Sequence, residues 1–212
     1  MAILAFDMDG VLMDSEPVYL KRSEQFLESL GYHPSRVFLN KMVGSNSRMD
    51  FQLLKENIPG FYDDIESYQT ARRAYFAGQT IDYKELLNKE AYITFQKLKE
   101  NNHSLCIASS SPRDAIEKII AMLHVERFID FIISGEEFQK SKPNPEIYQF
   151  VKSRYIGNDS QIFAVEDSTF GIQAAKAAGL KIICKIDNRF GFEQDGADYY
   201  INELSEIIDI VR

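Results

Sequence analysis

The feature that most constrains the fold is a series of short apolar segments in which hydrophobic and polar residues do not alternate. Such segments are typical of strands buried on both faces, as in parallel sheets. Helical stretches lie between them, and this alternation favours an α/β fold with a doubly wound parallel sheet. The predicted strands are 2–6, 104–108, 131–133, 161–165, 181–185 and 198–201, and the helices between them are 89–101, 112–123, 145–154 and 169–178.

Residues 15–86 interrupt this pattern because they contain no convincing strand. They predict consecutive helices at 16–30, roughly 35–42, roughly 47–57 and roughly 62–77. We therefore predict a core domain of residues 1–14 and 87–212 and an inserted α-helical cap domain of residues 15–86. Because the insert directly follows the first strand, we expect it to form a mobile lid over the end of that strand.

Two carboxylates, Asp7 and Asp9, follow the first predicted strand, and Gly10 allows a sharp turn after them. Ligands bind outside the carboxyl ends of the strands in open parallel sheets. Two acids held close together repel each other unless a cation shares the site. The motif therefore indicates a metal-assisted carboxylate centre. The alternative is an ordinary turn with Asp7 as a solvated strand end.

Hydroxyl groups follow the second predicted strand, where Ser109, Ser110 and Ser111 precede a helix that starts at Pro112. The free N–H groups of a helix start and small hydroxyl side chains suit an anion. The alternative for this motif taken alone is that the serines only cap the helix.

A lysine and a second pair of acids complete the pattern. Lys142 stands in a turn stiffened by two prolines, and Glu166 and Asp167 follow the strand 161–165. Taken alone, these residues could be a surface lysine, a solvated loop residue and a helix cap. In combination with the acids and hydroxyls above, they favour a magnesium site, because Mg²⁺ prefers carboxylate oxygens and water shared with a substrate phosphate.

The order and spacing of these motifs resemble the haloacid dehalogenase (HAD) superfamily, which has a Rossmann-like core, over the whole chain. The residues around them are similar to the β-phosphoglucomutase-like phosphatase branch, whose members carry a helical cap. The segments that carry the resemblance are 7–11, 13–17, 108–113, 134–137, 142–148 and 166–168, with Gly171 and Ile172 after the last.

The resemblance implies a role for each motif residue. Asp7 attacks phosphorus, and Asp9 acts as general acid and then general base. Ser109 and the backbone N–H of Ser110 bind the phosphoryl oxygens, and Lys142 links the phosphate to the Asp7 side. These assignments predict an aspartyl-phosphate enzyme.

The resemblance also implies Mg²⁺ as the cofactor. Its predicted ligands are Asp7, the backbone carbonyl of Asp9, and Asp167, with Glu166 in support or acting through water. The candidates for contacts with the rest of the substrate are Arg48, Arg113, Ser111 and Tyr19.

We therefore expect a phosphatase for a small phosphorylated metabolite such as a sugar phosphate. The alternatives are a hexose phosphomutase of the β-phosphoglucomutase type and a non-catalytic binding module, and the intact motifs disfavour the latter. Tyr19 stands where the branch often has His, and Pro112 stands where the mutases have Lys. Both departures favour hydrolysis over mutase activity.

Composition excludes several other functions. The chain of 212 residues carries a net charge of −8, which disfavours non-specific nucleic-acid binding. It shows no bilayer-spanning run and no signal-peptide pattern. Cys106 and Cys184 lie in apolar segments, which predicts free thiols in a reducing cytoplasm. We expect a monomer, with a dimer as the alternative, and surface or loop positions for His33, His103 and His124.

Overall fold

The computed structural model describes residues 1–156, 161–191 and 193–212. The chain divides into two compact units, a core unit (Met1–Ser15 with Tyr83–Arg212) and a helical unit (Glu16–Asp82). The helical unit ends at Asp82, a few residues before the end at residue 86 that the sequence predicts. The reason is that the N–H of Asp14 donates to the Leu86 carbonyl at 2.7 Å, which attaches the stretch after residue 82 to the core unit.

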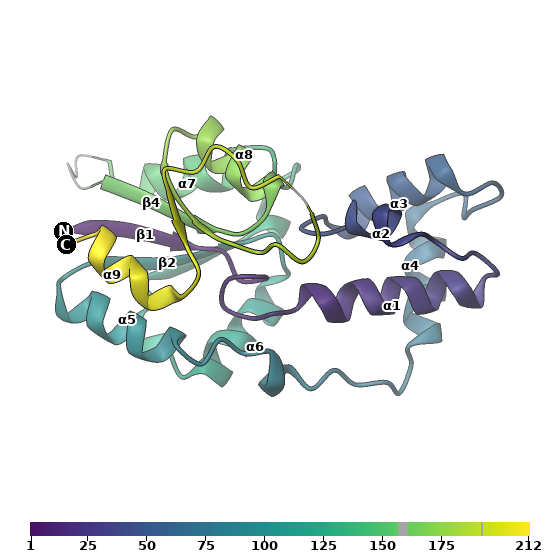
Figure 1. The fold of residues 1–212 in the computed structure, drawn as a ribbon, viewed down its shortest axis with the longest axis horizontal. Coiled ribbons are helices and arrows are strands. Elements are labelled where there is room, and N and C mark those ends of the chain that lie inside the picture. Colours follow the sequence, from purple (N-terminus) through teal and green to yellow (C-terminus); the bar gives the residue numbers. More distant parts are fainter. Residues whose placement is uncertain (157–160, 192) are drawn as a thin grey trace. The chain divides into compact units, whose positions relative to one another are not determined.

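The core unit is built on a six-stranded sheet with the order β3-β2-β1-β4-β5-β6 (Figure 1). All neighbouring strands in it are parallel. The strands are β1 (Ala2–Phe6), β2 (Ser104–Ser109), β3 (Phe131–Ser134), β4 (Gln161–Glu166), β5 (Lys181–Lys185) and β6 (Tyr199–Ile201). The doubly wound α/β fold predicted from the sequence is confirmed.

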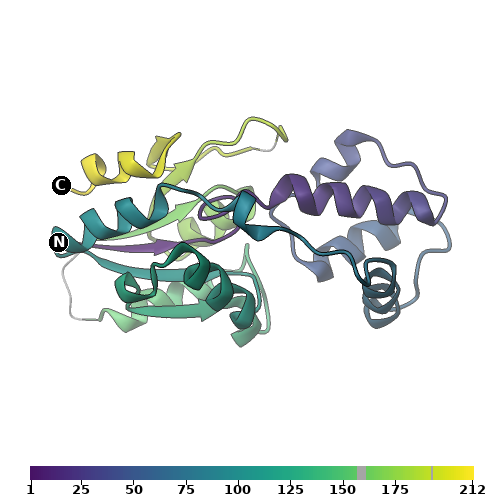
Figure 2. The same cartoon turned by 90° about the horizontal axis from the view of Figure 1, so that it is seen from below.

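Helices cover both faces of this sheet (Figures 1 and 2). One face carries α7 (Glu146–Arg154) and α8 (Thr169–Ala177), and the other carries α5 (Ala91–Glu100), α6 (Arg113–Leu123) and α9 (Ile207–Ile210). Short 3₁₀ helices, which the sequence did not predict, are η1 (Tyr83–Leu86), η2 (Glu126–Phe128), η3 (Gly135–Glu137) and η4 (Leu204–Glu206).

Because helices cover both faces of the sheet, its strands are unbroken apolar segments in the sequence. Leu4 and Phe6 of β1 pack in the cluster under α5 and α6, whereas Ala5 packs in the cluster under α7 and α8. Each residue of the strand is therefore buried, whichever face it points to. The thiols of Cys106 and Cys184 are free and buried in the core unit, as expected.

The helical unit contains α1 (Glu16–Ser29), α2 (Arg36–Asn40), α3 (Ser47–Asn57) and α4 (Ile65–Tyr75). Helix α4 starts later than the expected residue 62 because Asp64 caps it and accepts a hydrogen bond from the N–H of Ser67 at 2.8 Å. Within the described ranges, no helix is both long and apolar enough to cross a membrane.

His103 lies in the loop before β2, as predicted, and its side chain is buried there. Its Nδ1 accepts a hydrogen bond from the N–H of Ala2 at 2.9 Å. Burial lowers the pKa of His103, which favours the neutral ring that can accept this bond. The residue therefore has a structural role, joining the turn before β2 to the start of β1.

An enclosed carboxyl group lies within the helical unit. Asp50 accepts a hydrogen bond from the Ser45 hydroxyl. Burial raises the pKa of Asp50 to about 6, although the Ser45 bond and the charge of Arg72 oppose the shift. An Asp in an unfolded chain titrates near ~3.9. The folded protein therefore holds this proton more tightly, and ionisation of Asp50 reduces stability as the pH rises from about 4 to about 6.

We predict that Asp50→Asn removes the loss of stability that ionisation of Asp50 causes. The Tm of the variant should exceed that of the unmodified protein near about pH 7, and the difference should shrink towards about pH 4, where the native carboxyl is protonated. Thermal unfolding followed by circular dichroism at several pH values measures this, with the exposed Asp63→Asn as the control. A difference in Tm that stays constant with pH would contradict the explanation.

Candidate active site

The C-terminal ends of β2, β1 and β4 are neighbours in the sheet, and each is followed by polar residues. Asp7 follows β1, Ser109 ends β2, and Glu166 ends β4 with Asp167 after it. The N–H of Asp7 donates to the Val165 carbonyl at 2.9 Å, which continues the pairing of β1 and β4 up to the carboxylate. In open parallel sheets, ligands bind at this edge, where the chain connections diverge on either side of the first strand.

The ammonium group of Lys142 links the three strand ends. Its Nζ donates to Asp7 Oδ1 at 2.8 Å, to Glu166 Oε1 at 2.6 Å and to the Ala108 carbonyl at 3.0 Å. The residue is only 6% exposed. Burial favours the neutral amine, but the two carboxylates outweigh this effect and raise the pKa of Lys142. The charged ammonium group of Lys142 therefore uses all three of its N–H donors. These three hydrogen bonds join the ends of β1, β2 and β4.

Three buried carboxylates gather around this ammonium group. Oxygen atoms of Asp7, Glu166 and Asp167 all lie within 4.8 Å of one another. Burial raises the pKa of Asp7 to about 7; Lys142 opposes this shift, while Glu166 and Asp9 add to it. One ammonium group balances only one of these carboxylates, so a divalent cation would stabilise the cluster further.

The donor set and its surroundings fit Mg²⁺. Carboxylate oxygens are the ligands that this ion prefers, and Glu166 Oε2 is buried without a hydrogen-bond partner among the described residues. Glycines leave room for two of the acids. A Cβ on Gly10 would lie 1.8 Å from Asp167 Oδ2, and one on Gly171 would lie 1.9 Å from Glu166 Oε2. Both positions therefore require glycine for the carboxylates to stand where they do.

The carboxylate of Asp9 is held by two hydroxyl groups. Ser15 Oγ donates to Oδ1 at 2.6 Å, and Ser111 Oγ donates to Oδ2 at 2.7 Å. The carbonyl of Ser111 in turn accepts a hydrogen bond from Ser134 Oγ at 2.7 Å. Ser111 was predicted as a substrate contact, and Ser15 was missed. The structure places both beside Asp9, where they fix its orientation.

The loop after β2 presents hydrogen-bond donors. Ser109 is buried, and its hydroxyl accepts a bond from the N–H of Ser111 at 3.1 Å. The Ser110 hydroxyl accepts a bond from Ser141 Oγ at 3.0 Å. The backbone N–H groups of Ser110 and Asp9 have no acceptor within the part of the chain that the structure describes. Backbone N–H groups in folded proteins need an acceptor, so these two suit an anion.

Tyr148, which was not among the predicted site residues, lies in the first turn of α7 and contacts the same cluster. Its hydroxyl donates to Glu166 Oε1, and Lys142 Nζ lies 5.1 Å from the centre of its ring. Burial, with a further contribution from the Glu166 charge, raises the pKa of Tyr148 well above its usual value. The hydroxyl therefore remains a donor. Its place in the segment 142–148, close behind Lys142, was the one signal in the sequence.

Gln194 was also missed, because it lies in an irregular segment without a motif. Its Nε2 donates to the carbonyls of Asp167 and of Lys185, the latter at 3.0 Å. Its Oε1 accepts a bond from the N–H of Asp187 at 2.9 Å. These bonds attach the loop after β5 to the backbone of Asp167.

The other predicted substrate contacts are Arg113, Arg48 and Tyr19. Arg113 Nη2 donates to Glu137 Oε1 at 2.6 Å and to the Ile132 carbonyl at 3.1 Å, so this guanidinium is engaged beside β3. Arg48 is exposed in the first turn of α3, and Tyr19 is half-buried in α1. Both belong to the helical unit, and their contact with a substrate stays a prediction.

A family model described as haloacid dehalogenase-like hydrolase matches residues 4–185. The chain belongs to this family. Membership confirms the prediction from the motifs and makes the chain an enzyme of the HAD superfamily. A phosphorylated carbohydrates phosphatase of Thermotoga maritima is 30% identical over 186 residues, with 86% of this chain and 84% of that protein covered. The fructose-1-phosphate phosphatase of Escherichia coli is 25% identical over 182 residues, with 85% and 94% covered.

Solved structures share the HAD fold. CbbY from Rhodobacter sphaeroides with bound xylulose-(1,5)bisphosphate has a TM-score of 0.75 at 20% identity, covering 97% of this chain and 96% of that one. A β-phosphoglucomutase from Clostridium difficile has a TM-score of 0.71 at 18% identity, covering 97% and 92%. At 20% and 18% identity, these two neighbours show that the fold is shared.

We predict that Gly10→Ala weakens Mg²⁺ binding by at least about tenfold, or about 1.4 kcal/mol. The new Cβ would displace the carboxylate of Asp167. Gly60→Ala is the matched control, because Gly60 has a φ of +74° against +77° for Gly10 and no atom within 4 Å of an added Cβ. Calorimetry measures the affinity, and equal Mg²⁺ affinities in both variants would argue against Asp167 as a ligand.

Proposed function

We propose that the chain is a Mg²⁺-dependent phosphatase that hydrolyses a small phosphorylated metabolite, of the sugar phosphate class, through an aspartyl-phosphate on Asp7. One observation carries the proposal: Lys142 holds Asp7 Oδ1 at 2.8 Å, while Oδ2 accepts no hydrogen bond from the described residues. One oxygen of the carboxylate is thus fixed and the other is available as a nucleophile. The phosphatase names of the two sequence relatives support the substrate class.

In the first step, Asp7 Oδ2 attacks phosphorus, and the bond between phosphorus and the leaving oxygen breaks. Asp9 donates a proton to that oxygen. The Ser109 hydroxyl and the N–H of Ser110 donate hydrogen bonds to the phosphoryl oxygens, where charge gathers in the transition state. The product of this step is an acyl phosphate, which hydrolyses more readily than the original ester.

In the second step, a water molecule attacks the phosphorus of the acyl phosphate. Asp9 takes the proton of this water, phosphate leaves, and the Asp7 carboxylate is restored. The oxygens of Asp9 accept hydrogen bonds from Ser15 and Ser111. A protonated carboxyl group keeps acceptor capacity on its oxygens, so both hydroxyl bonds can persist while Asp9 donates its proton to the leaving oxygen.

Asp7, Asp167 and the carbonyl of Asp9 are the proposed Mg²⁺ ligands, with Glu166 beside them. When bound, the ion supplies positive charge against the phosphoryl oxygens. Lys142 adds a fixed charge next to the nucleophile. Its bonds to Asp7 and Glu166 keep both acids in place before metal and substrate bind.

Transfer of the phosphoryl group to a sugar hydroxyl, as in a mutase, is the alternative that a structural neighbour's name raises. A mutase has to hold a sugar phosphate in two orientations, which calls for cationic contacts near the phosphate loop. Pro112 offers no charge, and the Arg113 guanidinium is engaged by Glu137. Both observations favour water as the acceptor.

We predict that the protein with Mg²⁺ releases phosphate from compounds such as fructose 1-phosphate, and that Asp7→Asn lowers this turnover by at least about a thousandfold. An amide is not a nucleophile for phosphorus. Asp209→Asn, an exposed change near the end of the chain, is the matched control. A phosphate-release assay with and without EDTA measures the effect. Turnover that survives EDTA, or that persists in purified Asp7→Asn, would contradict the proposal.

We predict that Tyr148→Phe lowers kcat by about tenfold with little change in KM. The ring and its packing remain, but Glu166 loses a buried hydrogen-bond donor and its position relative to Lys142 relaxes. Tyr199→Phe, an exposed change on β6, is the control. A lower Tm with unchanged kcat would indicate that the Tyr148 hydroxyl serves stability alone.

A further inference from the structure

Arg189, which follows β5, binds two carboxylates at once. Its Nη1 and Nη2 donate to the two oxygens of Asp14 at 2.8 and 2.7 Å. Its Nε donates to Asp187 Oδ1 at 2.9 Å, and its Nη2 donates to Asp187 Oδ2 at 2.5 Å. Each carboxylate therefore faces two N–H groups of the guanidinium, and such paired bonds fix the orientation of the partners as well as their distance.

Asp187 is the anchored partner of Arg189. Its side chain is only 9% exposed. The N–H of the preceding residue, Ile186, donates to the Ile201 carbonyl at 2.8 Å, which continues the pairing of β5 with β6. Burial raises the pKa of Asp187, but the hydrogen bonds from Arg189 outweigh burial and lower it below its usual value. Asp187 thus carries a negative charge next to the sheet and holds the guanidinium in place.

Asp14 is the other partner, and it lies next to the loop that carries Asp9. The N–H of Gly10 donates to the Met13 carbonyl at 2.7 Å, which closes this loop immediately before Asp14. Ser15, immediately after Asp14, is buried and donates to Asp9 Oδ1 at 2.6 Å. The position of the Ser15 hydroxyl, and with it that of the Asp9 carboxylate, therefore depends on where the backbone at Asp14 is held.

The guanidinium of Arg189 also separates two like charges. Without it, the carboxylates of Asp14 and Asp187 would repel each other. The side chains of Arg189 and Asp14 are 49% and 51% exposed, so water can hydrate Asp14 once it is released. Exposed ion pairs usually contribute little to global stability. We therefore expect loss of Arg189 to displace Asp14 rather than to unfold the protein.

We propose that Arg189 is a positioning residue for the general acid of the reaction. It holds Asp14, the backbone at Asp14 places Ser15, and Ser15 orients Asp9. The inference rests on the proposed phosphatase function, in which Asp9 donates a proton to the leaving oxygen. Arg189 acts through Asp14 and needs no contact with the substrate.

Two substrates with different leaving groups separate this role from a purely structural one. Fructose 1-phosphate releases a sugar alcohol, whose oxygen needs the proton from Asp9. p-Nitrophenyl phosphate releases p-nitrophenolate, which is stable as an anion and leaves without that proton. The ratio kcat/KM covers the steps up to departure of the leaving group, so it reports on Asp9 as an acid. We expect Arg189→Met to lower kcat/KM by at least about tenfold for fructose 1-phosphate and by less than about threefold for p-nitrophenyl phosphate.

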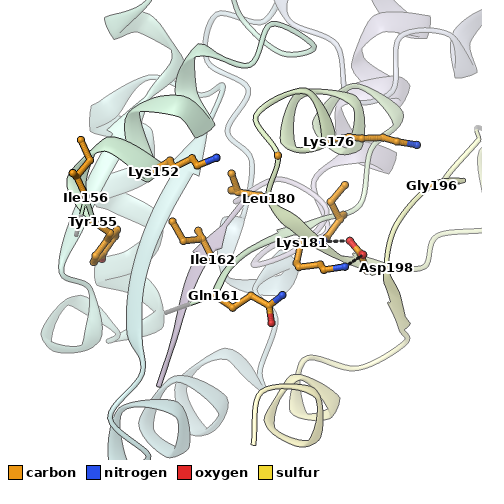
Figure 3. A pocket seen from close by; sticks show the side chains of 12 residues that line it. Lys152, Tyr155, Ile156, Gln161, Ile162, Lys176, Leu180, Lys181, Gly196 and Asp198 are labelled. Carbon is orange, nitrogen blue, oxygen red and sulfur yellow. Dashed lines mark hydrogen bonds and ion pairs between the residues drawn. The ribbon is translucent and has the colours of Figure 1, made fainter. Parts of the chain in front are cut away.

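Lys181→Met is the matched control. Lys181 is the first residue of β5, at the end of the strand away from Asp187, and its Nζ lies 2.5 Å from Asp198 Oδ1 (Figure 3). Its side chain is 46% exposed, against 49% for Arg189, so the control removes an ion pair of similar exposure. We expect it to change kcat/KM by less than about twofold with either substrate. Circular dichroism verifies that each variant is folded.

Asp14→Asn tests the path from Arg189 to Asp9. It should show the same dependence on the leaving group, which keeps the inference testable if Arg189→Met does not fold. The double variant should lose no more kcat/KM than the more impaired single variant, because both changes break one connection.

Equal losses with both substrates, losses no larger than those of the control, or additive losses in the double variant would overturn the inference and leave the phosphatase function intact. Absence of Asp7-dependent hydrolysis in the unmodified protein would overturn the proposed function and this inference with it.

Discussion

Lys142 places one buried positive charge between the ends of β1, β2 and β4. Its three hydrogen bonds, to Asp7, Glu166 and the Ala108 carbonyl, lie between 2.6 and 3.0 Å. Removing one partner of a buried ion pair typically costs about 3–5 kcal/mol, because the other charge stays behind in a low dielectric. The acids of the site are therefore held by the same interaction that joins the strands, so the nucleophile is positioned before a substrate arrives.

The residues around the ammonium group of Lys142 accommodate several charged side chains in a small space. Gly10 and Gly171 leave space for the carboxylates of Asp167 and Glu166. The Tyr148 hydroxyl shares Glu166 Oε1 with Lys142, so a single oxygen carries two of the site's buried bonds. The remaining negative charge explains why a cluster of this kind is suited to a divalent cation and to an anionic substrate that arrives with it.

Much of this architecture could be predicted from the sequence, because strands buried on both faces leave unbroken apolar segments. The residues that end those strands, such as Asp7, could be recognised from their position. The structure adds contacts between segments far apart in the chain. Gln194 contacts the carbonyl of Asp167, 27 residues before it in the chain, and no local pattern in the sequence marks this contact. The burial of His103 could not be predicted for the same reason, since its partner Ala2 lies 101 residues away.

The proposed mechanism requires that a phosphoryl group is carried on Asp7 during turnover. Borohydride reduces an acyl phosphate to an alcohol, so quenching the working enzyme with borohydride converts a phosphorylated Asp7 side chain into that of homoserine. Mass spectrometry of the N-terminal peptide locates the change. We expect homoserine at position 7 only when both Mg²⁺ and a phosphorylated substrate are present. Steady turnover without reduction at Asp7, or with reduction at another carboxylate, would contradict it.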